Sequence, residues 1–104
     1  MTILNSFSTP RAPNEIIGGD GGDVLDGRAM VKDSNGVDRT ENFLRGAHQT
    51  LAIARLLNTK TAYLKQRSPS CGFGLIKRGK EVVRGNGVTA ELLARNGIKI
   101  VAVD

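Results

Sequence analysis

Residues 62–74, Ala-Tyr-Leu-Lys-Gln-Arg-Ser-Pro-Ser-Cys-Gly-Phe-Gly, join a short apolar run to a small glycine-rich loop that holds the only cysteine of the chain. A strand that ends in such a loop delivers its last side chains to the carboxyl edge of a sheet, where open α/β folds bind ligands. Gly72 and Gly74 let the backbone bend tightly, so that its N–H groups can converge on an anion or a thiolate. The stretch therefore predicts a ligand-binding loop in an α/β fold.

The composition fits one domain, residues 1–104, with an aliphatic core. The chain has 104 residues, no Trp, one Tyr and three Phe, and its 13 glycines and three prolines predict many turns. A single cysteine cannot form an internal disulfide, so nothing points to an oxidising compartment. The first residues lack the features of a signal peptide or a membrane span. We therefore expect a cytoplasmic protein without a membrane partner.

The net charge of +5 makes anionic partners worth considering. The 15 basic residues are scattered along the chain, whereas nucleic-acid binders gather their charge on one face and add stacking aromatics, which are scarce here. Direct nucleic-acid binding is therefore disfavoured. The positive charge instead favours a small anionic ligand, for example a phosphorylated one.

The amino-terminal part predicts extended structure. Residues 1–7 form a weak strand candidate, and the two prolines of Thr9-Pro10-Arg11-Ala12-Pro13 exclude helix and display Arg11 on a stiff segment. A guanidinium held there can clamp a carboxylate, a phosphate or a ring carbonyl of a substrate. The alternative is a solvated arginine on a surface loop.

A glycine-rich turn follows. Residues 18–22, Gly-Gly-Asp-Gly-Gly, lack both the Lys-Ser/Thr ending of a phosphate loop and the acidic spacing of a calcium loop. They predict a flexible connection after a strand at 15–18. Residues 23–32 then predict an antiparallel meander that the Asn35-Gly36 turn closes.

The rest of the chain alternates helices and strands. Thr40 is a candidate N-cap for a helix over 41–58, in which His48 is expected to face solvent. The further predicted elements are a strand at 61–65, a hairpin at 75–83 with a solvated basic tip at 77–80, a helix at 88–96 closed by Gly97, and a strand at 98–103.

Two of these strands predict a small parallel sheet. Residues 61–65 and 98–103 are joined by one right-handed crossover, and the continuous apolar run of the second is typical of a strand covered on both faces. A parallel sheet needs more strands than two. Unless residues 1–7 supply one, another chain must cover an edge, so we expect a homodimer.

Five motifs occur in an order that resembles a known family. They are Thr9-Pro10-Arg11-x-Pro13-x-Glu15-Ile16, Gly36-Val37-Asp38-x-Thr40, Phe43-x-x-Gly46-Ala47, Leu64-Lys65-x-x-Ser68-Pro69-Ser70-Cys71-Gly72 and Gly85-x-Gly87-Val88-Thr89-Ala90-x-Leu92-Leu93. The chain is similar, from Thr9 onward, to the TudS-like thiouracil desulfurases. The resemblance implies a small Rossmann-like three-layer α/β domain with a parallel sheet core and antiparallel hairpins, shortened at its amino terminus.

The resemblance also implies a chemistry. Members of the family hold a [4Fe–4S] cluster by three cysteines and leave one iron open to take sulfur from a thiolated pyrimidine such as 2-thiouracil. Cys71 matches the last of these metal ligands, and the family's other two cysteines precede the position of Thr9. Ser68 and Ser70 match the serines beside it, so the implied catalytic residues are Ser68, Ser70 and Cys71. The proline segment and the cysteine loop themselves predict the substrate-binding residues Arg11, Gly72, Phe73 and Gly74.

Two functions stay open at this point. The chain is a desulfurase-like enzyme whose Cys71 thiolate is favoured by Lys65 or Arg67, or it is a non-catalytic family domain that forms a dimer and binds a small anionic ligand. A redox sensor is a third possibility, but Cys71 has no resolving cysteine beside it. The simplest role for Cys71 is that of a small buried hydrophobic residue.

Overall fold

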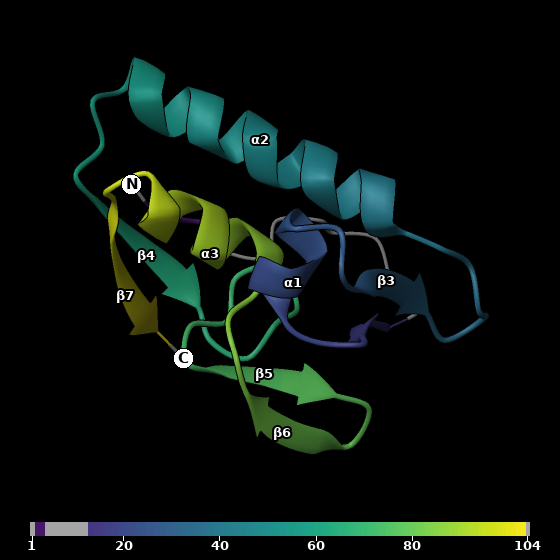
Figure 1. The fold of residues 1–104 in the computed structure, drawn as a ribbon. Coiled ribbons are helices and arrows are strands. Elements are labelled where there is room, and N and C mark those ends of the chain that lie inside the picture. Colours follow the sequence, from purple (N-terminus) through teal and green to yellow (C-terminus); the bar gives the residue numbers. More distant parts are fainter. Residues whose placement is uncertain (1, 4–12, 104) are drawn as a thin grey trace.

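The computed structural model describes residues 2–3 and 13–103 (Figure 1). Arg11 and most of the strand expected at 1–7 lie outside these residues. In chain order the elements are β1 (Thr2–Ile3), β2 (Asn14–Ile17), α1 (Gly21–Leu25), β3 (Met30–Asp33), α2 (Thr40–Leu56), β4 (Thr61–Lys65), β5 (Leu75–Arg78), β6 (Glu81–Arg84), α3 (Val88–Arg95) and β7 (Lys99–Val103).

The main sheet is parallel, with the strand order β1-β4-β7. Tyr63 pairs with Val101 on one side and with Thr2 on the other, so β4 is the central strand. The predicted parallel pair is confirmed, and the amino-terminal segment supplies the third strand. The mixed α/β fold with a parallel sheet and antiparallel hairpins is therefore the one expected from the sequence.

Helices cover one face of this sheet among the described residues. Ala62 and Leu64 of β4 are fully buried, whereas Tyr63 between them is 43% exposed. Figure 1 shows α2 and α3 side by side, and α3 also packs on β7. The helices α2 and α3 therefore lie over the face of the sheet on which Ala62 and Leu64 are buried.

The prediction that the last strand is covered on both faces is wrong. β7 lies at the edge of the sheet, and Lys99 and Ala102 are exposed. A branched apolar run favours any pleated, partly buried surface, so it does not distinguish a central strand from an edge strand.

The meander predicted over residues 23–32 is also wrong, because α1 begins this stretch. Asp20 and Asp23 form a reciprocal capping box: each carboxylate accepts the other residue's backbone N–H, at 3.3 and 3.0 Å. The expected flexible glycine turn is therefore a helix start. β2 and β3 still pair antiparallel, with Ile16 opposite Val31, but α1 connects them.

The start of α2 differs from the prediction as well. Thr40 is the first helical residue, and its Oγ1 accepts the N–H of Val31 at 2.9 Å instead of capping the helix. The Asp38 carboxylate accepts the Thr40 N–H at 2.9 Å. The predicted exposure of His48, the β5–β6 hairpin and the end of α3 before Gly97 are all confirmed.

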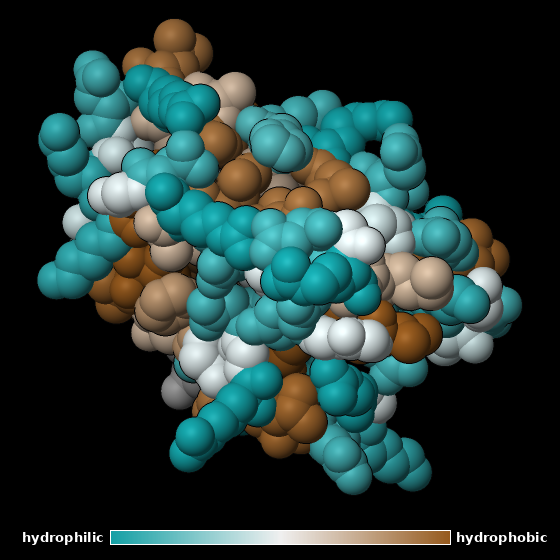
Figure 2. Space-filling view, in the orientation of Figure 1, coloured by the Kyte–Doolittle hydropathy of each residue, from teal (hydrophilic) through white to brown (hydrophobic). Residues whose placement is uncertain are grey.

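The core is aliphatic, as predicted from the scarcity of aromatic residues. Its largest fully buried side chains are Ile16, Leu64, Ile76, Leu93, Val24, Val31 and Val88. Figure 2 shows hydrophilic side chains interspersed with several apolar patches on one face, one of them at the carboxyl end of α2. Leu56 and Leu57 there are 80% and 63% exposed. Within the part of the chain that the structure describes, no helix is long and apolar enough to cross a membrane.

Candidate functional site

The cysteine loop is docked on the amino-terminal end of α3. The backbone N–H of Val88 donates to Pro69 O at 2.8 Å, and that of Thr89 donates to Ser70 O at 2.9 Å. These N–H groups belong to the first turn of α3 and have no partner inside the helix. Because the loop carbonyls accept their hydrogen bonds, this helix end is closed to an anion.

The N–H groups of the loop are engaged too. Their acceptors are Ser68 Oγ for Cys71 at 2.7 Å, Ser68 O for Gly72 at 2.9 Å, Gln66 Oε1 for Phe73 at 2.9 Å and Asn86 Oδ1 for Gly74 at 2.7 Å. The expected cradle of free N–H groups is therefore wrong for residues 71–74. The loop is built to hold its own shape.

Cys71 lies in the hydrophobic core and is 6% exposed. Burial raises the pKa of its thiol, and the hydroxyls of Ser70 and Ser68 oppose this shift only in part. The Cys71 Sγ lies 3.8 Å from Ser70 Oγ. The expected lowering of the thiol pKa by Lys65 or Arg67 is wrong, since burial dominates and the thiol stays protonated.

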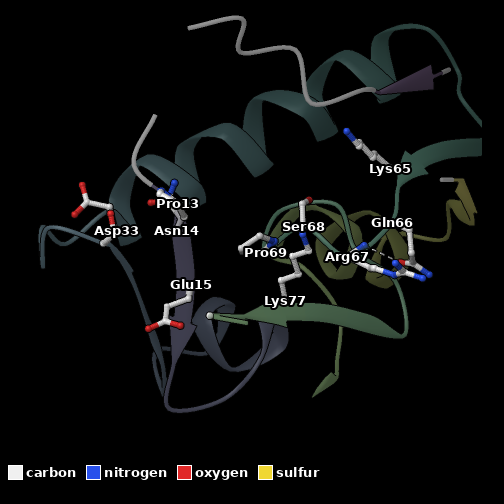
Figure 3. Close-up of a pocket in the computed structure, with 12 residues that line it drawn as sticks. Pro13, Asn14, Glu15, Asp33, Lys65, Gln66, Arg67, Ser68, Pro69 and Lys77 are labelled. Carbon is white, nitrogen blue, oxygen red and sulfur yellow. Dashed lines mark hydrogen bonds between the residues drawn. The ribbon is translucent and has the colours of Figure 1, made fainter. Parts of the chain in front are cut away.

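A pocket lies beside Ser68 and is lined by the residues that directly follow β4. Its volume is about 540 Å³, and residues 65–69 form one wall, while Glu15 on β2 and Lys77 on β5 come from other strands (Figure 3). This is the carboxyl end of the central parallel strand, where the sequence predicted a ligand site.

The predicted site residues separate into two groups. Ser68 lines the pocket, whereas Ser70, Cys71 and the three residues Gly72, Phe73 and Gly74 are not among its lining residues. Arg11 lies outside the described residues. The structure thus brings Ser68 to the pocket and places Cys71 behind it in the core.

Most pocket residues have no site role predicted from the sequence, among them Glu15, Gln66 and Lys77. Glu15 stands in the first family motif, Lys77 was expected in a solvated hairpin tip, and Gln66 follows the last residue of β4. The Gln66 side chain fixes Phe73 by accepting its N–H and by donating to its carbonyl at 3.2 Å. The sequence signal that could have identified Gln66 as a site residue is its position directly after a predicted strand.

The pocket carries an excess of free positive charge. Asp33 is 8% exposed, and its carboxylate accepts N–H groups from Val37 and Asn35 and pairs with Arg39 at 3.1 Å. The Val37 hydrogen bond is the main cause that lowers its pKa. Lys65, Arg67 and Lys77 form no ion pair within residues 13–103.

Comparison with known proteins places the chain in a family. The model of the 2-thiouracil desulfurase family matches residues 3–104. The chain belongs to that family. The resemblance that the five sequence motifs carried is therefore confirmed.

Two relatives of this desulfurase-family chain show how far the likeness extends. An uncharacterised protein, YbbK of Bacillus subtilis (strain 168), is 46% identical over 103 residues, which cover 96% of this chain and 68% of the relative. The solved structure of a [4Fe-4S]-dependent thiouracil desulfidase, TudS, superposes with a TM-score of 0.75 at 34% identity. The match covers 93% of this chain and 60% of that one, so the chain spans less than two thirds of the desulfidase structure.

The donor set of this desulfurase-family chain does not fit an iron–sulfur cluster by itself. Such clusters are held by several thiolates, and the sequence has one cysteine. Over residues 2–3 and 13–103, no three His, Cys, Asp or Glu side chains come together as a metal site. Cys71 is buried, and as the single cysteine it can offer at most one thiolate ligand.

Proposed function

We propose that this chain binds a thiolated pyrimidine such as 2-thiouracil in the pocket beside Ser68, as the ligand-binding part of a desulfurase. The observation that carries the proposal is the position of the pocket: it adjoins the Ser68-Pro69-Ser70-Cys71-Gly72 motif in a chain of the 2-thiouracil desulfurase family. The removal of sulfur needs thiolate ligands that this sequence does not contain, so binding is the activity assigned to these residues.

The Ser68 side chain is suited to contact the ligand. Its Oγ accepts the Cys71 N–H at 2.7 Å, which fixes the position of the hydroxyl at the pocket wall. Among the described residues its own O–H has no oxygen or nitrogen acceptor and only the Cys71 sulfur is near it, so it can donate to the carbonyl or thiocarbonyl of a pyrimidine. The hydrogen bond to Cys71 also links the pocket to the closed loop behind it.

Calorimetric titration of the chain with 2-thiouracil tests this function. We expect one site per chain and weaker binding by Ser68→Ala, by roughly fivefold to tenfold, because one neutral hydrogen bond contributes about 1 kcal/mol. The control is Ser34→Ala, which removes a second pocket serine that has no comparable place in the loop. Absence of 2-thiouracil binding by the wild-type chain contradicts the proposal.

A second candidate is a non-catalytic family domain that binds a small anion and forms a dimer. The three unpaired cations at the pocket favour an anion, and the outer edge of β7 carries no strand among the described residues. Titration with inorganic phosphate and sedimentation of the ligand-free chain test these two parts. Tight phosphate binding together with no response to 2-thiouracil favours this candidate over the first.

A further inference from the structure

We infer that Glu15 determines which pyrimidines the pocket accepts, by taking a hydrogen bond from a ring N–H group. The inference rests on the proposed function and adds to it the residue that distinguishes a pyrimidine from a simple anion. Glu15 lies on β2, is partly buried and lines the pocket opposite the segment that follows β4. In Figure 3 Lys77 lies between Glu15 and Arg67.

Two other polar side chains at the pocket, those of Asp33 and Gln66, have their acceptor atoms occupied. Asp33 holds Arg39 and two backbone N–H groups. Gln66 Oε1 accepts the N–H groups of Arg67 and Phe73, at 3.1 and 2.9 Å. The Glu15 carboxylate, by contrast, has neither a hydrogen bond nor an ion pair with any residue of 13–103, although Lys32 stands opposite Glu15 in the β2–β3 register.

A partly buried carboxylate without a partner favours a ligand that donates. Burying an unpaired polar group costs free energy, and a charged acceptor gains more from a hydrogen bond than a neutral one. The Glu15 Oε2 atom lies near Gly79, at 3.7 Å from where a Cβ of that residue would stand. Gly79 has no side chain to fill this side of the pocket, so the carboxylate can be reached.

The pocket has both a hydrogen-bond acceptor and hydrogen-bond donors, and these match the groups along the edge of a pyrimidine ring. A thiouracil presents N–H donors flanked by carbonyl and thiocarbonyl acceptors. Glu15 can accept from an N–H group, while Lys77 or Arg67 can donate to the neighbouring oxygen or sulfur. A simple anion such as phosphate carries negative charge of its own, and Glu15 repels it. The pocket therefore favours a ring with both kinds of group.

The test compares Glu15→Gln and Glu15→Ala with the wild-type chain by calorimetric titration. We expect 2-thiouracil to bind at least tenfold more weakly to Glu15→Ala, since hydrogen bonds to charged groups contribute about 1.5–3 kcal/mol. Its affinity for Glu15→Gln should lie between those for Glu15→Ala and wild type, because glutamine keeps an acceptor. Inorganic phosphate should bind more tightly to both variants. Glu81→Gln, an exposed residue outside the pocket, is the matched control for the change in charge.

Methylated ligands identify the contact itself. Either 1-methyl- or 3-methyl-2-thiouracil should bind the wild-type chain more weakly than 2-thiouracil, and this difference should disappear in Glu15→Ala. If wild type binds 2-thiouracil and Glu15→Ala binds it equally well, the inference fails while the proposed function stands. If wild type does not bind 2-thiouracil at all, the proposed function fails and the inference with it. Far-ultraviolet circular dichroism of each variant confirms that it is folded.

Discussion

The loop over residues 70–74 and the pocket wall over residues 65–69 adjoin one another but differ in how their polar groups are used. In the loop, the N–H groups of residues 71–74 and the carbonyls that face α3 are hydrogen-bonded, and Cys71 is buried. At the wall, Lys65 and Arg67 form no ion pair within residues 13–103. The comparison separates a part that maintains structure from a part that is free to bind.

This difference has a physical cause in the packing of glycines. A Cβ at Gly87 would stand only 2.7 Å from Pro69 O and closer still to the carbonyl of Ser70, and one at Gly72 would stand 2.5 Å from Leu75 O. The loop can approach α3 this closely only because these positions lack side chains. In the pocket wall, the carbonyls of Ser68 and Pro69 share in these contacts, whereas residues 65–67 are not among the closest neighbours of either glycine and line the open volume.

The largest expected effect is therefore that of Gly87→Ala, which forces the loop away from α3. Gly87 has φ −69°, which alanine adopts without strain, so the cost is steric. We expect a loss of roughly 3 kcal/mol in the free energy of unfolding, because the clashing atoms are backbone and cannot rotate away. Urea denaturation measures it.

Gly46→Ala is the matched control for that substitution. Gly46 lies inside α2, and a Cβ there meets no atom within 4 Å among the described residues. Alanine should stabilise the chain by roughly 1 kcal/mol, since glycine is the poorer helix former. Equal effects of the two substitutions, in sign and size, contradict the tight docking of the loop.

Cys71→Ser should have the next largest effect. It places a hydroxyl among apolar side chains, where the hydroxyls of Ser70 and Ser68 are the polar groups near the sulfur position, and we expect a loss of about 1–2 kcal/mol. In native wild-type protein, alkylation of the thiol by iodoacetamide at pH 8 should be at least tenfold slower than in urea. Rapid alkylation of the native thiol shows instead that the loop is open.

The pH dependence of stability tests the same burial. Burial raises the folded-state pKa of the Cys71 thiol above its unfolded-state value. The stability that the neutral thiol contributes is then complete below the unfolded-state pKa and is lost as the pH rises through the folded-state pKa. The free energy of unfolding of wild type should therefore fall more steeply in alkaline solution than that of Cys71→Ala, which cannot ionise there.

The sequence was sufficient for most of the fold because its elements carry local signals. The strand at 61–65 and the helix that ends before Gly97 have clear apolar patterns and were placed within a residue or two. α1 was missed because it is five residues long and depends on distant contacts. The Gly21 N–H donates to Asn86 O at 2.6 Å, a contact between residues 65 positions apart that no local pattern indicates.

The site could be predicted only in part, for a related reason. Ser68 follows a strand in a family motif, so its place at the pocket was foreseeable. The burial of Cys71 depends on the docking of its loop on α3, which follows from Gly87 being close-packed. Glu15 and Lys77 reach the pocket from β2 and β5, and their meeting is a property of the tertiary arrangement alone.

The smallest expected effect on stability is that of Lys77→Ala, which tests the pocket in the way that Gly87→Ala tests the loop. Lys77 is exposed and forms no ion pair among the described residues, so the free energy of unfolding should change by less than about 0.5 kcal/mol. Phosphate affinity should fall severalfold, since the pocket loses one of three cations.

Lys80→Ala is the control, because Lys80 is also exposed on the hairpin but does not line the pocket. If the two variants weaken phosphate binding equally, general surface charge and not the pocket attracts the anion. A large loss of stability in Lys77→Ala contradicts the view that the charged pocket residues are free to bind a ligand, because it means that this lysine already stabilises the fold.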